Sequence, residues 1–456
     1  MRYKFKKYIL NPVESWTFEE YLTEARTNSP GYLRIAIVDH TINRGGGSRV
    51  LRNLLPAIKK LRPDWKIVFY ANLAAIERDG LHKELSPYLE FKELKSVKLI
   101  NMKLLSRIRG GTTLITFIQR KFQKLLSFFP YSFSGALHKE IKELSKAYDL
   151  IFCPWPYLIE CPKLPSSIPV VAIFHDFNFR YYFSGPTLHP IHMEYLEKEI
   201  PQWLRLSIPV VSTHFMKQEL EKFYPEFSSK THVIHLSSLG AETKINLFEA
   251  EKIINALGIT NPYLLYPTNT TIHKNIGSLL GAFYILCKKY PNLKLVLTGY
   301  GTESINGKAK SFGLQRGMEN RDVIGLGYVT NLQIDALIQC ANVVISTSLY
   351  EAGCGPGLDA WQRAVPVAMS NIPPFIERLE VQGVRAQVFD PQSPLDIAEK
   401  IDSILSHPEE AKEDALYSQQ KLSEYGWDRV AQKYINVFEK ALHEKNSSVS
   451  SSSAWK

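Results

Sequence analysis

Short apolar runs alternate with segments of helical periodicity along most of the chain. Residues 33–38 form a nearly continuous apolar run, which is typical of a strand buried on both faces of a parallel sheet. Three glycines follow, and apolar residues then recur at helical spacing between Arg49 and Leu61, with Pro56 as a candidate kink. The pattern predicts a strand, a glycine turn and a helix. Similar successions continue as far as His235.

A second alternating series begins beyond a polar linker near residue 240. The further strands predicted in the first half are 67–71, 149–153, 169–174, 209–212 and 232–235, and those in the second half are 263–266, 294–298, 323–326, 343–347, 365–369 and 386–389. Strands that alternate with helices indicate parallel sheets. We therefore expect an α/β fold with two doubly wound, Rossmann-like domains that face a cleft, and ligands at the carboxyl ends of the strands.

Length and composition agree with two domains. The 456 residues are 45% hydrophobic and 22% charged, which are ordinary values for a globular protein. We place the first domain at 1–240 and the second at 241–424, and we expect the serine-rich segment 446–456 to be a disordered tail. No apolar run is long enough to span a membrane, and the first ten residues lack a signal-peptide core.

Cysteine content indicates the cellular compartment, and net charge indicates the kinds of partner. Five scattered cysteines without a C-x-x-C pair predict reduced thiols in the cytoplasm and no zinc site. A formal net charge of +10 favours anionic partners, such as phosphorylated small molecules, nucleic acid or an acidic membrane surface.

One segment of the first half, 94–139, contains no Asp or Glu and many Lys and Arg. Within it, residues 113–129 carry apolar side chains at helical spacing beside basic ones. Such a basic amphipathic helix is typical of proteins that bind peripherally to a membrane surface, here the inner face. A core helix whose basic residues line an acceptor cleft explains the pattern equally well.

The segment 346–369 is the most informative for chemistry. Glu351 follows a predicted strand, and the glycine-rich turn 353–355 leads into Pro356 and a helix. The dipole and unpaired N–H groups at such a helix N-terminus favour an anion, and Asp359, one turn further, is placed to bond hydroxyls beside a phosphate. From the residues alone, a glycine-rich turn with a solvated acid is an equally good interpretation.

This segment resembles the signature of family four of the retaining glycosyltransferases (glycosyl transferases group 1, GT-B fold), E-G-F-G-x-P-x-x-E followed by a G-V-P-V strand. Here Glu351 to Asp359 read E-A-G-C-G-P-G-L-D, and 364–367 read A-V-P-V. Gly353 stands in place of the usual aromatic residue and Cys354 in place of the second glycine. Asp359 replaces the second glutamate, so its reach toward a ribose is shorter by one methylene.

Other segments resemble the family in the same order along the chain. Lys274, within 266–275, matches a lysine that binds the donor diphosphate, but Thr268 or Asn269 stands where the family has an arginine. Gly299 resembles a strand-end G-x-G, and Val329 lies in a loop that resembles the one near the nucleobase.

The first half and the C-terminal end carry further matches. Residues 45–49 resemble a glycine loop near the diphosphate, and 174–176 resemble a loop whose histidine, here His175, contacts the donor. Trp427, by itself a core anchor, stands where the family begins a terminal helix. The resemblance implies that this helix, 425–445, packs back on the first domain.

The resemblance implies a retaining glycosyltransferase that moves a sugar from a nucleotide-sugar to a saccharide or lipid-linked acceptor, without a covalent enzyme intermediate. Glu351 and His175 would bind the donor sugar as the catalytic residues. The implied donor-binding residues are Gly46, Gly47, Asn269, Lys274, Gly299, Val329, Gly353, Cys354, Gly355 and Asp359. Because no acidic pair at a strand end suggests a metal site, we expect neither a metal nor another cofactor.

Three alternatives fit the same residues. A sugar-nucleotide epimerase or a glycosyl phosphorylase can use the same two-domain architecture. A non-catalytic basic protein that binds lipid or nucleic acid is the third, although no nucleic-acid recognition motif is evident. His175 taken alone is more typical of a structural histidine.

Overall fold

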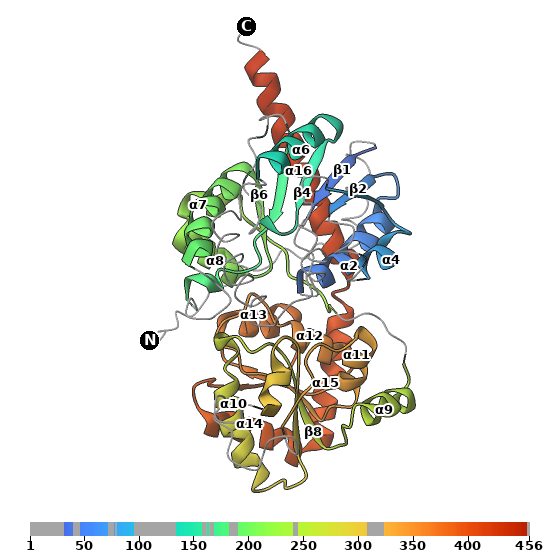
Figure 1. Ribbon diagram of the computed structural model, residues 1–456, viewed down its shortest axis with the longest axis vertical. Helices are drawn as coiled ribbons and strands as arrows, with labels where there is room; N and C mark the ends of the chain where they lie inside the picture. Colours follow the sequence, from blue (N-terminus) through green and yellow to red (C-terminus); the bar gives the residue numbers. More distant parts are fainter. Residues whose placement is uncertain are drawn as a thin grey trace, which may run out of the picture.

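The computed structural model describes residues 32–39, 46–71, 77, 80–94, 134–156, 161, 164, 168–181, 190–239, 245–307 and 323–453. These residues form two α/β domains stacked along the long axis of the molecule (Figure 1). Each domain contains one parallel sheet, and the fold class expected from the alternating pattern is confirmed. Most of the basic segment 94–139, namely residues 95–133, lies outside the described residues.

The sheet of the first domain has seven parallel strands. They are β1 (Arg34–Val38), β2 (Lys66–Ala71), β3 (Glu90–Glu93), β4 (Leu150–Cys153), β5 (Val170–Ile173), β6 (Ile208–Val211) and β7 (His232–Val233), in the order β3-β2-β1-β4-β5-β6-β7. β3 was not predicted, because its sequence Glu-Phe-Lys-Glu has no apolar run. It pairs with β2 at the edge of the sheet, where its residues are largely exposed and polar side chains are tolerated.

The sheet of the second domain has six parallel strands in the order β10-β9-β8-β11-β12-β13. They are β8 (Tyr263–Pro267), β9 (Lys294–Thr298), β10 (Val323–Gly325), β11 (Val343–Ser346), β12 (Val367–Ser370) and β13 (Gln387–Phe389). Each was predicted to within two residues at either end. In both sheets the chain reverses direction across the sheet beside the first strand, at β1/β4 and β8/β11, where doubly wound folds bind ligands.

Helices cover both faces of each sheet, and apolar clusters fill the space on each face. The helices of the first domain are α2 (Gly46–Leu61), α4 (Leu81–Leu85), α6 (Ser134–Ala147), α7 (Pro190–Leu206) and α8 (His214–Phe223). Those of the second domain are α9 (Leu247–Ala256), α10 (Ile276–Cys287), α11 (Asn331–Gln339), α12 (Gly355–Gln362), α13 (Pro373–Gln382), α14 (Pro394–Ser406) and α15 (Pro408–Ser423). Among the described helices, none combines the length and the apolar character needed to cross a membrane.

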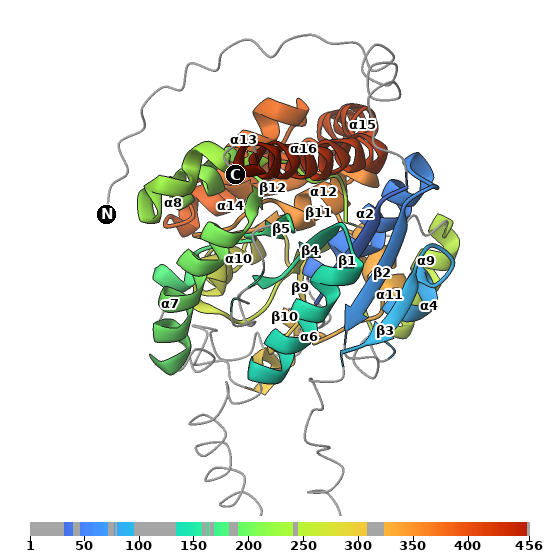
Figure 2. The same ribbon diagram turned by 90° about the horizontal axis from the view of Figure 1, so that it is seen from above.

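The last helix, α16 (Trp427–Ser453), leaves the second domain and packs along α2 of the first. In Figure 2 it lies on the face of the first sheet opposite α6 and α7. Phe438 and Tyr434 of α16 contact Phe152 of β4, with ring centroids 5.3 and 6.0 Å apart. The two domains are thereby joined by a second chain crossing besides the linker near residue 240.

Two expected boundaries need correction. The segment expected to be a disordered tail from residue 446 continues α16 as far as Ser453, since it contains neither proline nor glycine to end the helix. At the other end of the chain, α2 begins at Gly46, three residues before the predicted start, so Gly46 and Gly47 belong to its first turn and not to a loop.

Candidate active site

A cleft of about 810 Å³ lies between the domains, at the carboxyl ends of both sheets. The structure brings nearly all of the predicted site residues to this cleft. His175 and Gly47 line it from the first domain, and Asn269, Lys274, Gly299, Val329, Glu351, Gly353, Cys354, Gly355 and Asp359 line it from the second. Gly46 is adjacent in sequence at the start of α2.

A lysine–glutamate ion pair occupies the second-domain side of the cleft. Lys274, in the turn after β8, donates to Oε1 of Glu351, in the loop after β11, and Oε1 also accepts from Oγ of Ser348 at 2.7 Å. Burial lowers the pKa of Lys274, but the Glu351 carboxylate outweighs it, so the pKa is raised and the lysine stays charged. Oε2 of Glu351 has no hydrogen-bond partner among the described residues and remains available to a ligand.

Polar side chains at the ends of β8 and β11 fix the backbone of Lys274 through hydrogen bonds. The Tyr266 hydroxyl donates to the backbone carbonyl of Lys274 at 3.1 Å and shares a 2.9 Å hydrogen bond with Ser348. Thr347 donates to the same carbonyl at 3.1 Å. Because these bonds join the strand ends of β8 and β11, Lys274 and Glu351 are positioned by the core of the second domain.

The N-terminus of α12 faces the same cleft, with Pro356 in its first turn. Within the described part of the chain, the backbone N–H groups of Gly353, Cys354 and Gly355 have no partner. Unpaired N–H groups and the helix dipole together attract a phosphate.

The departures from the family motif are accommodated by neighbouring residues. A Cβ atom at Gly353 would lie 3.2 Å from Nη2 of the buried Arg378, so this arginine occupies the space next to the residue that is usually aromatic. A Cβ atom at Gly357 would lie only 2.5 Å from Sγ of Cys354. The cysteine in place of a glycine therefore depends on a glycine three residues later.

His175 faces the pair from the opposite domain. Its Nε2 lies 2.8 Å from the carbonyl oxygen of Pro154, and its ring lies 4.7 Å from that of Trp155, centroid to centroid. Burial lowers its pKa to about 4, so the imidazole is neutral at pH 7. With Nε2–H donating to the carbonyl, the remaining nitrogen, Nδ1, is an acceptor.

Two further titratable groups of this cleft were not predicted. Asp176 follows His175, and burial raises its pKa to about 6, with the Glu351 charge acting in the same direction. His273 precedes Lys274, and burial followed by the lysine charge lowers its pKa to about 4. Their proximity in sequence to predicted residues was the only signal that could have indicated them.

Asp359 is not open to the cleft in the way its predicted ribose contact requires. The side chain is buried, and its Oδ1 accepts from the backbone N–H of Leu239 at 3.1 Å and from Ser238 at 3.3 Å. Oδ2 accepts from Nη2 of Arg49 at 2.5 Å. Arg49 is the last residue of the segment 45–49 and belongs to α2 of the first domain, and its pairing with Asp359, 310 residues away, was not predicted.

The far end of the cleft is formed by the loops after β9 and β10. Gly299 has a φ of 115°, and a Cβ atom there would lie 1.8 Å from the carbonyl oxygen of Thr268, so only glycine fits. Tyr300 and Tyr328 line this end, are 56% and 58% exposed, and have ring centroids 6.4 Å apart. Asn269 uses its side-chain oxygen to accept from the backbone of Thr271 at 3.0 Å.

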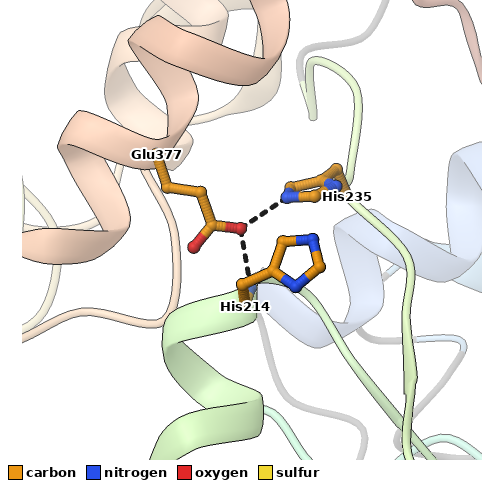
Figure 3. A group of neighbouring side chains, drawn as sticks. All are labelled: His214, His235 and Glu377. Carbon is orange, nitrogen blue, oxygen red and sulfur yellow. Dashed lines mark hydrogen bonds and ion pairs between the residues drawn. The ribbon is translucent and has the colours of Figure 1, made fainter. Parts of the chain in front are cut away.

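Beside the cleft, Glu377 of α13 joins the second domain to the first (Figure 3). Its Oε1 accepts from the backbone N–H of His214 at 2.6 Å and from Nε2 of His235 at 2.5 Å, and its Oε2 accepts from the N–H of Phe215 at 3.0 Å. Glu377 thus caps α8 across the domain boundary. The two histidines and Glu377 carry potential metal ligands within 4.8 Å of one another, but the hydrogen bonds already account for their arrangement.

Comparison with known proteins identifies the second domain. Residues 248–421 match the family described as "Glycosyl transferases group 1". An uncharacterized glycosyltransferase of Methanocaldococcus jannaschii, MJ1607, is 27% identical over 240 residues, which is 50% of this chain and 58% of the relative. O-antigen chain mannosyltransferase B of Escherichia coli is 23% identical over 283 residues, 59% of this chain and 69% of the relative. The matched region thus spans little more than half the length of the archaeal protein.

The whole described architecture is similar to solved structures. Anabaena Alr3699/HepE, crystallised with UDP and glucose, superposes with a TM-score of 0.62 over 90% of this chain and 100% of its own, at 15% identity. This likeness shows the two-domain GT-B fold. The second half of the chain thus matches the glycosyl transferases group 1 family, and the described residues as a whole have the GT-B fold.

Proposed function

We propose that the protein is a retaining glycosyltransferase that uses a nucleoside-diphosphate sugar bound in the cleft between its domains. The observation that carries this proposal is the convergence, on one cleft, of Lys274, Glu351, the N-terminus of α12 and His175. The match of residues 248–421 to the glycosyl transferases group 1 family, and the UDP and glucose held by a protein of the same fold, support it.

The cleft offers the groups that departure of a nucleoside diphosphate requires. Negative charge develops on the diphosphate as the glycosidic bond breaks, and fixed donors in a partly dry site stabilise that charge. Lys274 and the N–H groups of residues 353–355 are such donors. Since they act without a metal ion, we propose that transfer is metal-independent, and we expect activity to persist in excess EDTA.

Glu351 and His175 are proposed to bind the donor sugar from opposite sides. Oε2 of Glu351 accepts from sugar hydroxyls, while Lys274 holds the carboxylate in its ionised form. Neutral His175 accepts through Nδ1, because its Nε2 is engaged by Pro154. Retention follows from the family resemblance, with the acceptor attacking on the face that the diphosphate leaves.

Tyr300 and Tyr328 are proposed to contact the nucleobase. Both rings are more than half exposed although they line a cleft, and base–aromatic stacking tolerates every base because each has a π face. The choice among bases then depends on hydrogen bonds from the loop around Val329.

The acceptor is proposed to be a saccharide or a lipid-linked saccharide near an anionic membrane. This step rests on the sequence of 94–139, which is basic and free of acidic residues. The protein is expected to sediment with vesicles that contain anionic lipid and to be released by salt, because salt screens exposed charges. Replacement of Arg120, Lys121 and Lys124 together by glutamine should abolish sedimentation, and undiminished binding would contradict this part of the proposal.

Calorimetric titration with UDP, GDP, ADP and dTDP tests the donor site. We expect one or more of these to bind, and Lys274→Ala to weaken binding by about 1.5–3 kcal/mol, or about 10- to 150-fold. Lys289→Ala is the matched control, since it removes a lysine from an ion pair with Asp402 on the surface of the same domain.

Incubation with sugar nucleotides separates the alternatives. Transfer to an added acceptor supports the proposal. Epimerised sugar nucleotide without an acceptor, or sugar phosphate formed only with inorganic phosphate, would assign the cleft to a different reaction. Absence of binding to every nucleotide would refute the donor site itself.

A further inference from the structure

The cleft lacks one positive charge on its second-domain side. A nucleoside diphosphate carries about two negative charges at its phosphates, yet the loop 267–275 brings only Lys274, which is already paired with Glu351. Thr268 and Asn269, at the position of the expected arginine, are uncharged. Additional positive charge must come from elsewhere if the diphosphate is to be held by protein groups alone.

Arg49 of the first domain has the geometry to provide it. It lies in the first turn of α2, immediately after Gly47 and Ser48, and lines the cleft. Nε donates to the carbonyl of Leu239 at 3.2 Å, and Nη2 donates to Asp359. Nη1 has no partner among the described residues, and the side chain is 33% exposed.

The other arginines that line the cleft are less suited to a ligand. Arg378 is 1% exposed and donates to the backbone carbonyls of Leu236 and Ser212. Arg52, one turn after Arg49 on the same helix, is 13% exposed and is paired with Glu84 of α4 at 2.6 Å. Arg49 is the most exposed of the three.

Asp359 determines where the guanidinium of Arg49 lies. The acid is in the first turn and a half of α12, so its ion pair carries Arg49 across the domain boundary to the N-terminus of that helix. That is also where the unpaired N–H groups of residues 353–355 face the cleft. The aspartate is itself fixed by Leu239 and Ser238 and therefore serves as a rigid anchor.

We propose that Arg49 binds the donor diphosphate from the first domain and replaces the arginine that is absent at Thr268 and Asn269. Asp359 positions the guanidinium for this role. The inference rests on the proposed function. The diphosphate then bridges Arg49 of one domain and Lys274 of the other, so nucleotide binding favours the arrangement of the domains in this structure.

Calorimetry on the full chain tests the proposal with the tightest-binding of UDP, GDP, ADP and dTDP, and with the corresponding nucleoside. We expect Arg49→Gln to weaken diphosphate binding by about 10- to 100-fold and to leave nucleoside binding unchanged. Arg49→Lys should retain part of the affinity, since it keeps the charge but loses the planar fork. Arg52→Gln is the matched control on the same helix and should bind as the wild type does.

Asp359→Asn tests whether Arg49 contacts the phosphates or serves only as a latch, that is, as an ion pair that holds the two domains together. It removes the negative charge that pairs with Arg49 but keeps the arginine and a side-chain oxygen that can still accept its hydrogen bond, so diphosphate binding should remain within about threefold of the wild type. If Asp359→Asn weakens binding as much as Arg49→Gln does, the pair acts as a latch and the proposal is overturned. Equal affinity of wild type and Arg49→Gln overturns this inference alone, whereas no diphosphate binding by the wild type overturns the proposed function with it.

Discussion

Substitution of Gly357 by alanine tests how the altered motif is packed. Gly357 lies in the first turn of α12, and its φ is not positive, so the backbone accepts alanine. The new Cβ would nevertheless lie 2.5 Å from Sγ of Cys354 and 3.3 Å from the ring of Trp361. Cys354 is 1% exposed and Trp361 is fully buried, so neither side chain has room to move away.

The stability that Gly357→Ala is expected to remove follows from two opposing contributions. Overpacking a well-filled core costs about 1–3 kcal/mol, and alanine in a helix is favoured over glycine by up to about 1 kcal/mol. We therefore expect Gly357→Ala to lower the stability of the second domain by about 1–2 kcal/mol, which corresponds to about 2–8 °C in melting temperature for a domain of this size. Differential scanning calorimetry measures it.

A double-mutant cycle tests whether contact with Cys354 causes the loss of stability in Gly357→Ala. Cys354→Ala removes the sulfur that the new methyl group would meet, so the double variant should be more stable than the sum of the two single changes by about 1 kcal/mol or more. Gly277→Ala in the first turn of α10 is the matched control, since its Cβ would meet nothing within 4 Å. Strictly additive effects of the two substitutions, or a wild-type melting temperature for Gly357→Ala, would refute the packing argument.

Three further predictions concern the cleft and the domain contact. Glu351→Gln and His175→Ala should each reduce turnover by about 100-fold or more while the melting temperature stays within a few degrees, and a fully active variant would contradict the role of that residue. Lowering the pH from 7 to 5 should lower the melting temperature: His175 and His273, with a pKa of about 4, stay neutral in the fold while unfolded histidines bind protons below about pH 6.5. Asp176, with a pKa of about 6, has the opposite but smaller effect, and a melting temperature that rose on acidification would show that other groups dominate. Glu377→Gln should destabilise the contact between α13 and α8 by about 1–3 kcal/mol, seen as a lower melting temperature and faster proteolysis, and no change in either would exclude a role in joining the domains.

The motif around Gly353 and Cys354 shows how neighbouring residues compensate for departures from a family pattern. Gly353 and Cys354 differ from the family pattern, and taken separately each weakens the assignment. In the structure, Arg378 occupies the space next to Gly353, and the absent side chain of Gly357 makes room for Cys354. Each departure from the family motif is thus compensated by a neighbouring residue, and Arg378, the neighbour of Gly353, is 25 residues away in sequence.

The amino-acid sequence by itself determined the two parallel sheets and most of the cleft. Buried parallel strands need apolar runs on both faces, and the loops after them carry the polar residues, so both signals are local and readable. Glu351 was identified as a candidate in this way, whereas Lys274 and His175, which also lie in loops after strands, were identified by their resemblance to segments of the glycosyltransferase family. The edge strand β3 was not predicted, since its largely exposed residues do not form an apolar run.

Only the tertiary structure decided how these residues are paired. Glu351 meets Lys274 across 77 positions, Asp359 meets Arg49 across 310, and Glu377 meets His235 across 142. Such partners lie on different elements or domains, and nothing in the local pattern of either residue specifies the other. From the sequence, Asp359 was expected to bind a ribose. In the structure, where the two domains pack together, its oxygens instead accept hydrogen bonds from Arg49 and from the backbone N–H of Leu239.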